Sequence, residues 1–129
     1  MSLILTNAHS AAPHMNSNQK GKRGEREAAA FLTDEGFPAR RGQQFAGGTD
    51  SPDVLCESLS GLHFEVKRTE RGNPYDWISQ AQRDCGEKLP VVLHRRNDHE
   101  WLAVLPAKDF FRIVRESSFA DTPLALPNK

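Results

Sequence analysis

The stretch that decides the fold is residues 52–67, which read PDVLCESLSGLHFEVK. Residues 52–56 and 62–67 are rich in apolar residues and predict two strands, and the pair Ser60-Gly61 between them favours a turn. The first strand begins with a proline, which strands tolerate at their first residue. We therefore predict two neighbouring strands joined by a short turn.

The charged side chains of this stretch are expected to meet at one point. Because side chains alternate between the two faces of a strand, Glu65 and Lys67 share one face, while Phe64 and Val66 point to the core. Asp53 lies on the neighbouring strand. Hard cations take oxygen ligands from one or two carboxylates, and a lysine beside them can offset charge on a phosphate. The pattern favours metal-assisted hydrolysis; the alternative is an ordinary surface ion pair.

Length and composition limit the class of protein. A chain of 129 residues, 37% hydrophobic and 26% charged, is typical of one soluble globular domain. No apolar run reaches the roughly 20 residues of a membrane span, and the apolar residues at the start are too few for a signal peptide. We expect a cytoplasmic protein without a membrane partner. The net charge of zero does not by itself indicate nucleic-acid binding.

The order of the predicted elements indicates an α/β fold. We expect a disordered leader over residues 1–19, a domain over 20–117 and a flexible tail over 118–129. The helix between the third and fourth strands supplies a crossover, so these two strands can be parallel. The fold class is a mixed central β-sheet of about five strands flanked by helices. Helices are predicted at residues 24–35, 74–88 and 107–116, and strands at 37–41, 52–56, 62–67, 91–93 and 101–105.

The first predicted helix carries an acid on its inward side. Glu25 lies one turn before the apolar stripe of Ala28, Ala29 and Leu32. One explanation is that acids in a first turn favour the helix dipole. The other is that Glu25 reaches the metal or its waters, and the residues alone leave both open. Glu27 lies off the stripe and is interpreted as a solvated partner for nearby cations.

Basic residues recur around the predicted site. They are either ordinary solvated charges or the lining of a groove for phosphates, and their position favours the groove. The residues concerned are Lys20, Lys22, Arg23, Arg26, Arg40, Arg41 and Arg68.

Three polar residues have alternative interpretations. His63 shares the face of Glu65 and could act on a proton or a phosphate, but a hydrogen-bonded bystander is the favoured interpretation. Gln80 and Gln82, on the second predicted helix, could touch substrate, although exposed glutamines usually have no specific role.

The motif Pro52-Asp53 followed by Glu65-Val66-Lys67 resembles the signature of PD-(D/E)XK nucleases. Residues 20–27, which read KGKRGERE, resemble the N-terminal region of archaeal-type Holliday-junction resolvases. Bacterial and phage resolvase-like endonucleases share a similar layout. The resemblance covers residues 20–71 well and 90–105 more loosely. It implies a restriction-endonuclease-like fold.

The resemblance also implies roles for individual residues. In the family pattern, two strand acids and a helix acid bind the metal, a lysine is catalytic, and basic residues contact phosphates near the cut. The matching positions are Glu25, Asp53 and Glu65 for the metal, with the Val66 carbonyl as an extra oxygen, Lys67 for the lysine, and Arg26 and Arg41 for the phosphates.

The function implied is a Mg²⁺-dependent DNA endonuclease, with Mn²⁺ as an alternative ion, and specifically a structure-selective Holliday-junction resolvase. A four-way junction needs two symmetric nicks, so a homodimer is expected. Candidate dimer surfaces are the second predicted helix near Trp77 and the sheet edge. The alternatives are a restriction-type or repair nuclease acting on other DNA structures, and a catalytically silent DNA-binding module on the same fold.

Overall fold

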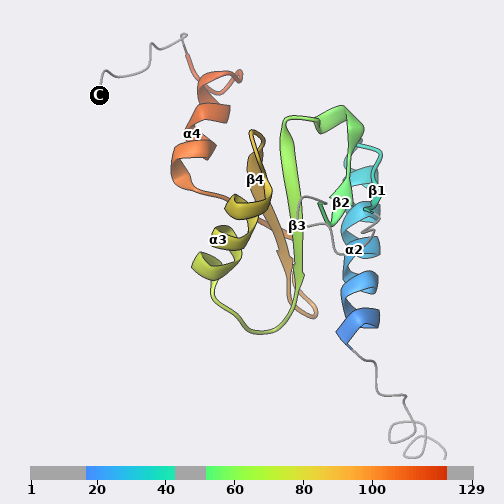
Figure 1. The fold of residues 1–129 in the computed structure, drawn as a ribbon. Coiled ribbons are helices and arrows are strands. Elements are labelled where there is room, and N and C mark those ends of the chain that lie inside the picture. Colours follow the sequence, from blue (N-terminus) through green and yellow to red (C-terminus); the bar gives the residue numbers. More distant parts are fainter. Residues whose placement is uncertain (1–16, 43–51, 122–129) are drawn as a thin grey trace, which may run out of the picture.

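The computed structural model describes residues 17–42 and 52–121, which form a five-stranded sheet with helices around it (Figure 1). The predicted α/β class with a mixed sheet is confirmed. Within the described residues, no helix has the length and apolar character needed to cross a membrane. The elements are α2 (Ser17–Asp34), β1 (Arg40–Arg41), β2 (Val54–Leu55), the short 3-10 helix η1 (Glu57–Leu59), β3 (Leu62–Arg68), α3 (Pro74–Asp84), β4 (Leu89–Arg95), β5 (Leu102–Val104) and α4 (Ala107–Arg115).

The sheet has the order β1-β2-β3-β4-β5, and its one parallel pair is β3 with β4. This pairing runs from Leu62 opposite Leu89 to Arg68 opposite Arg95. The other pairs are antiparallel. Parallel neighbours need a long connection, and α3 supplies it, as predicted.

The two long helices cover opposite faces of the sheet (Figure 1). On one face, α2 places its stripe of small and aliphatic residues against Phe64 of β3 and Val91 and Leu93 of β4. On the other face, α3 packs Trp77 and Ala81 against Val92. Residues of opposite faces alternate along β3 and β4, so one sheet supports two separate apolar clusters.

Glycines allow two close approaches between elements. A Cβ atom at Gly24 would lie 2.6 Å from the Cβ of Arg68, so only glycine lets α2 come this near to β3. Gly72 has a φ of 133° and lies under the indole of Trp77, which a Cβ would meet at 2.5 Å. The first approach matters for function, because it brings the start of the apolar face of α2, with Glu25, toward β3.

Helix α3 begins as the sequence predicts and ends earlier. The side chain of Asn73 accepts a hydrogen bond from the backbone N of Tyr75 at 2.8 Å, and Pro74 is the first helical residue. The helix ends at Asp84 instead of residue 88. Gly86, with a φ of 58°, takes the chain into a turn there.

Helix α2 begins at Ser17, seven residues before the predicted start at residue 24. Residues 17–23 have no apolar stripe, but glutamine, lysine and arginine are good helix formers. The last three residues of the predicted leader are therefore helical. Residues 1–16, the remainder of that leader, lie outside the described part of the chain, as do the loop at 43–51 and residues 122–129 of the predicted tail.

The first two strands are shorter than predicted, with two residues each. Pro38 has no N–H to donate to a ladder. The backbone N of Ala39 donates to the hydroxyl of Thr33 on α2 at 3.1 Å, so it does not take part in strand pairing. Strand β4 is longer than predicted, because it matches all seven residues of β3.

Candidate active site

Asp53 is fixed directly beside the Glu65-Val66-Lys67 triplet. Its Oδ2 accepts a hydrogen bond from the backbone N of Val66 at 2.8 Å. Its own backbone N donates to the carbonyl of Phe64 at 3.0 Å. The acid directly before β2 is thus tied to the middle of the acid-x-lysine motif on β3, and the structure brings these predicted site residues together.

Glu65 is buried and has a histidine partner. Glu65 and His63 are each only 3% exposed, and the His63 Nε2 lies 2.7 Å from the Glu65 Oε2. A buried ionised carboxylate is costly unless a donor satisfies it. His63 lies on the same face of the same strand, since residues i and i+2 share a face, and it supplies that donor when its Nε2 carries the proton.

Lys67 is held by the helix on the same side. Its Nζ donates to the Oε1 of Gln80 on α3 at 3.1 Å. Gln80 is half-buried, so our expectation of an exposed glutamine without a specific role was wrong. The lysine ammonium therefore has a defined position instead of a freely rotating one.

Glu25 lies where α2 approaches the strands. Its Oε1 accepts a hydrogen bond from the Nε of Arg41 on β1 at 2.8 Å. Burial raises the pKa of Glu25 above its ordinary value, although the hydrogen bond and the charge of Arg41 lower it. The charge of Glu65 raises the Glu25 pKa further, which places these two acids within electrostatic reach of each other.

The acids repel one another most clearly at Asp53. Burial, followed by the charge of Glu65, raises the pKa of Asp53 from an ordinary value of 3.8 to about 7. Glu25 adds to this rise, while the hydrogen bond from Val66 and the charge of Lys67 lower the pKa of the carboxyl group. Three carboxylates thus share a region with too little positive charge, which is the setting in which a divalent cation is stabilised.

The donor set fits a sparse metal site better than a closed cage. Across residues 17–42 and 52–121, no three histidine, cysteine, aspartate or glutamate side chains are grouped so that they could hold an ion. Glu25 is turned toward Arg41 and Glu65 toward His63. Mg²⁺ is usually bound through one or two carboxylates, waters and substrate phosphate, and Asp53 with Glu65 could supply those two carboxylates.

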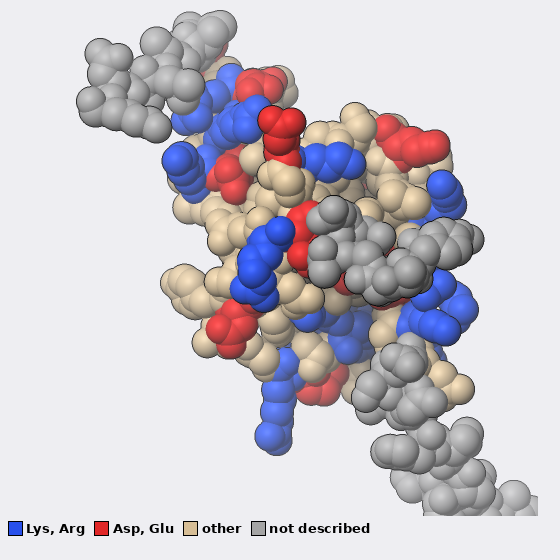
Figure 2. All heavy atoms as spheres, viewed as in Figure 1, with Lys and Arg blue, Asp and Glu red and all other residues tan. Residues whose placement is uncertain are grey.

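The predicted DNA-contacting residues fall into two groups. Lys22, Arg23, Arg26 and Arg40 are exposed on α2 and β1, and the side chain of Lys20 lies outside the described part. Figure 2 shows basic and acidic side chains interspersed over the visible face, not a single basic surface. A grip on DNA would therefore depend on a few exposed cations near the acids.

The second group consists of arginines that are paired with carboxylates of the protein. Arg41 bonds Glu25, as described above. Arg68 donates from Nε to Glu27 at 2.9 Å, and Glu27 also lies 3.5 Å from Arg95 and 3.9 Å from Arg23. Glu27 is a partner for nearby cations, as interpreted from the sequence. The role of Arg95 was not anticipated, although the parallel register would have placed it opposite Arg68.

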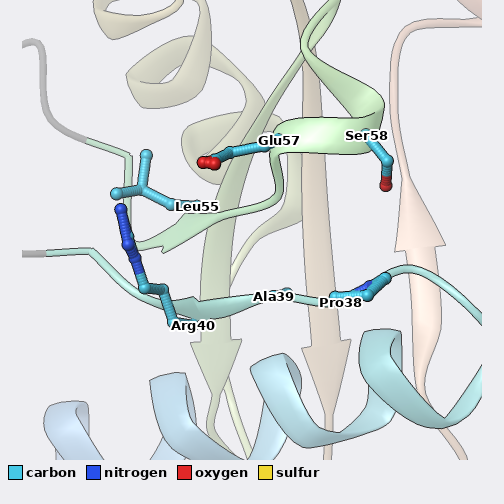
Figure 3. A pocket seen from close by; sticks show the side chains of 6 residues that line it. All are labelled: Pro38, Ala39, Arg40, Leu55, Glu57 and Ser58. Atoms are coloured by element: carbon cyan, nitrogen blue, oxygen red, sulfur yellow. The ribbon is translucent and has the colours of Figure 1, made fainter.

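Two pockets lie apart from the acids. Figure 3 shows one of about 430 Å³ beside β1 and η1, lined by Pro38, Ala39, Arg40, Leu55, Glu57 and Ser58. Another of about 520 Å³ lies at the carboxyl ends of β3 and β4, where Trp77 and His94 are among its lining residues. Neither is lined by Asp53, Glu65 or Lys67.

Comparison with known proteins identifies one family. Residues 16–113 match the family model for the archaeal Holliday junction resolvase Hjc. No curated protein matches the chain significantly. Among solved structures, Archaeoglobus fulgidus Hjc, described as a Holliday junction resolvase from an archaeal hyperthermophile, is 25% identical with a TM-score of 0.49. That alignment covers 67% of this chain and 72% of the other. The family that matches is the one predicted from the motifs.

Proposed function

The chain belongs to the archaeal Holliday junction resolvase family, and from that premise we propose that it cuts four-way DNA junctions at Asp53, Glu65 and Lys67. Membership makes it a structure-selective nuclease that hydrolyses DNA with a divalent ion. The residues that do so, and Mg²⁺ as the ion with Mn²⁺ as a substitute, are the proposal. One observation carries it: the 2.8 Å hydrogen bond from the Val66 amide to Asp53, which joins both halves of the motif.

The roles of the residues follow from their positions. Asp53 and Glu65 would hold the ion with the Val66 carbonyl, and Glu25, which bonds Arg41, would reach the waters of the ion from α2. When bound, a divalent ion lowers the pKa of a water molecule and polarises the scissile phosphate. Lys67 stabilises the negative charge that develops on the phosphate, and Gln80 keeps its ammonium in place.

We propose that exposed cations of α2 and β1 bind the DNA backbone. Such contacts are independent of base sequence, as a junction-selective enzyme requires. Because they are electrostatic, they weaken with salt. Arg41, although bonded to Glu25, lies close enough to the acids to contact a phosphate near the cut. Arg68 is assigned instead to the contact between α2, β3 and β4, because Glu27 occupies it. The proposed DNA contacts are Lys20, Lys22, Arg23, Arg26, Arg40 and Arg41.

The active unit is proposed to be a two-fold dimer, because one junction needs two symmetric cuts. Of the candidate surfaces named from the sequence, the second helix near Trp77 offers less apolar surface at that residue, because Trp77 is buried against the sheet. Helix α4 is a better candidate. It has no buried residue, and Phe110, Phe111 and Ile113 are 46%, 55% and 38% exposed. An apolar surface of this kind marks an interaction site, and a second copy would cover it.

The function is tested on a labelled immobile four-way junction with matched linear duplex, flap and single-strand substrates. Wild type in Mg²⁺ should make paired symmetric nicks in the junction only. Glu65→Gln should abolish them, while Glu57→Gln, an exposed glutamate on η1, should not. Cutting of every substrate would make the protein a general nuclease. Junction binding without any cleavage would make it a silent DNA-binding module.

The dimer is tested by light scattering during size-exclusion chromatography. Wild type should have twice the mass of one chain, and Phe111→Asp should reduce it to one. Tyr75→Asp, at an exposed aromatic residue on α3, is the matched control and should leave the dimer intact. A wild-type protein that is monomeric at micromolar concentration with and without junction DNA would contradict the proposed dimer.

A further inference from the structure

We infer that His63 is a positioning residue that orients Glu65 for the divalent ion. The inference rests on the proposed function, because it concerns how one of the proposed ligands is held. It assigns to His63 neither a proton transfer nor a phosphate contact. From the sequence, His63 was interpreted as a hydrogen-bonded bystander. That interpretation included the hydrogen bond but not its effect on the orientation of Glu65.

The geometry of the pair supports this role. The His63 Nε2 lies 2.7 Å from the Glu65 Oε2, and both residues are 97% removed from solvent, at 3% exposure each. For an ionised Glu65 to accept this bond, the proton must sit on Nε2. A hydrogen bond to a charged acceptor is short and directional, so it fixes both the rotation and the direction of the carboxylate.

The surroundings of Glu65 make such a donor necessary. Its cross-strand partner on β4 is Val92, which is fully buried in the apolar cluster under α3. Lys67, two residues further along the same face, donates a hydrogen bond from its ammonium to Gln80. Each charged member of the acid-x-lysine motif thus has its own polar partner, and the partner of Glu65 is His63.

The position of His63 argues against a direct role in the reaction. A general base must come within hydrogen-bond reach of the proton that it removes. His63 is buried and directs its Nε2 to a carboxylate inside the protein. Outer partners of metal ligands set ligand orientation and basicity, and removing one typically costs about 10- to 100-fold in metal affinity or activity.

The test compares three replacements of His63 by their effect on ion binding. Gln reaches about as far as histidine and keeps an N–H donor, Asn keeps the donor but is shorter, and Met fills space without a donor. Binding of Mn²⁺ is measured calorimetrically without DNA, and the rise in Tm on adding Mg²⁺ is measured in parallel. His94→Met is the matched control, because His94 is half-buried on the same face, with its Nε2 at the carbonyl of Thr69 and its ring against Trp77, and contacts no proposed metal ligand among the described residues.

The expected result is a loss of Mn²⁺ affinity of about 10- to 100-fold in His63→Met and His63→Asn, with His63→Gln within about threefold of wild type. His94→Met should also stay within about threefold. Binding of junction DNA in EDTA should be the same in all variants, because His63 does not contact DNA. Cleavage should require correspondingly more Mg²⁺ in the first two variants.

Equal ion affinity in wild type, His63→Asn and His63→Gln would overturn the inference. Equal losses in His63→Gln and His63→Asn would overturn it too, since reach would then be irrelevant. If His63→Met does not fold, the Gln and Asn pair decides alone. A wild-type protein that binds no divalent ion and cuts no junction would instead refute the proposed function, so the two failures are distinguishable.

Discussion

The two faces of β3 are almost equally buried and hold opposite kinds of chemistry. Toward α2, Phe64 is 4% exposed and packs among aliphatic residues. Toward α3, Glu65 is 3% exposed and bonds His63. Burial therefore does not separate the core from the site in this protein. The two differ in how the buried side chain of β3 is stabilised. Phe64 is stabilised by apolar packing, and Glu65 is stabilised by a hydrogen bond.

This difference gives the faces different sensitivities. A side chain in the packed face contributes through the apolar area that it removes from water and the space that it fills. A side chain in the polar face contributes through the orientation of a charge. Replacing a side chain of β3 that faces α2 should therefore lower stability. Replacing a charged side chain of β3 that faces α3 should lower activity while the fold persists.

The largest effect is expected for Phe64→Ala on the packed face. It should lower the free energy of unfolding by about 3–5 kcal/mol, because it leaves a cavity beneath α2. Urea denaturation measures this loss, and Phe119→Ala, at a residue that is 89% exposed, is the control with little expected change. A loss under 1 kcal/mol at Phe64 would show that the face is not packed as described.

The polar face should respond to Lys67→Met in the opposite way. Junction cleavage should fall by about 100- to 1,000-fold, the usual effect of removing a group that stabilises charge in a transition state. The Tm should hardly change, because methionine has a similar volume. Single-turnover rates measure the loss, with Lys88→Met, an exposed lysine, as control. Cleavage within tenfold of wild type would exclude Lys67 from the chemistry.

A third test concerns the repulsion between Asp53 and the neighbouring acids Glu65 and Glu25. Because the Asp53 pKa is about 7 in the folded protein and 3.8 ordinarily, ionised Asp53 destabilises the metal-free fold. That cost is absent below about pH 4, grows between pH 4 and 7, and is complete above pH 7. At about 1.36 kcal/mol per pKa unit it is at most about 4 kcal/mol, and less because the carboxyl group is partly exposed.

Asp53→Asn should consequently raise the Tm in EDTA by several degrees at pH 8 and by much less at pH 5. The asparagine carbonyl can still accept the Val66 hydrogen bond, so the variant removes mainly the charge. Thermal unfolding at the two pH values measures the difference. An equal shift at both would mean that Asp53 is not held in a repulsive cluster.

The smallest effect is expected at the support for the lysine. Gln80→Leu should reduce the cleavage rate by about tenfold, corresponding to one hydrogen bond to a charged group at about 1.4 kcal/mol. Gln82→Leu is the matched control, since Gln82 is exposed on the same helix. A tenfold loss at both positions would indicate a general effect of altering α3 and not of releasing Lys67.

The sequence predicted the elements whose signal is local. The alternation in residues 62–67 was sufficient to assign Phe64 and Glu65 to opposite faces, because strand geometry fixes that relation. The predicted start of the second helix at residue 74 was also correct, because the local residues Asn73 and Pro74 favour a helix start there. The crossover between β3 and β4 followed from the length of the connection.

The remainder depends on contacts between distant residues. No apolar periodicity indicates that α2 begins at Ser17. Strand β1 is shortened because the hydroxyl of Thr33 accepts the hydrogen bond from the backbone N–H of Ala39. The roles of Gln80 and Arg95 arise from packing of α3 and from the register of β4. Glycine at position 24 looked like a helix start, whereas it marks a close contact with Arg68.

The hydrogen bond between the Val66 amide and Asp53 has a further consequence for spectroscopy. The amide proton of Val66 points at a carboxylate whose charge changes near neutral pH, so its nuclear magnetic resonance shift should follow that titration. An ion that draws on the same carboxylate should alter the signal too. A single backbone resonance, between the acid and the lysine of the motif, thus reports the state of the site without any label at the site itself.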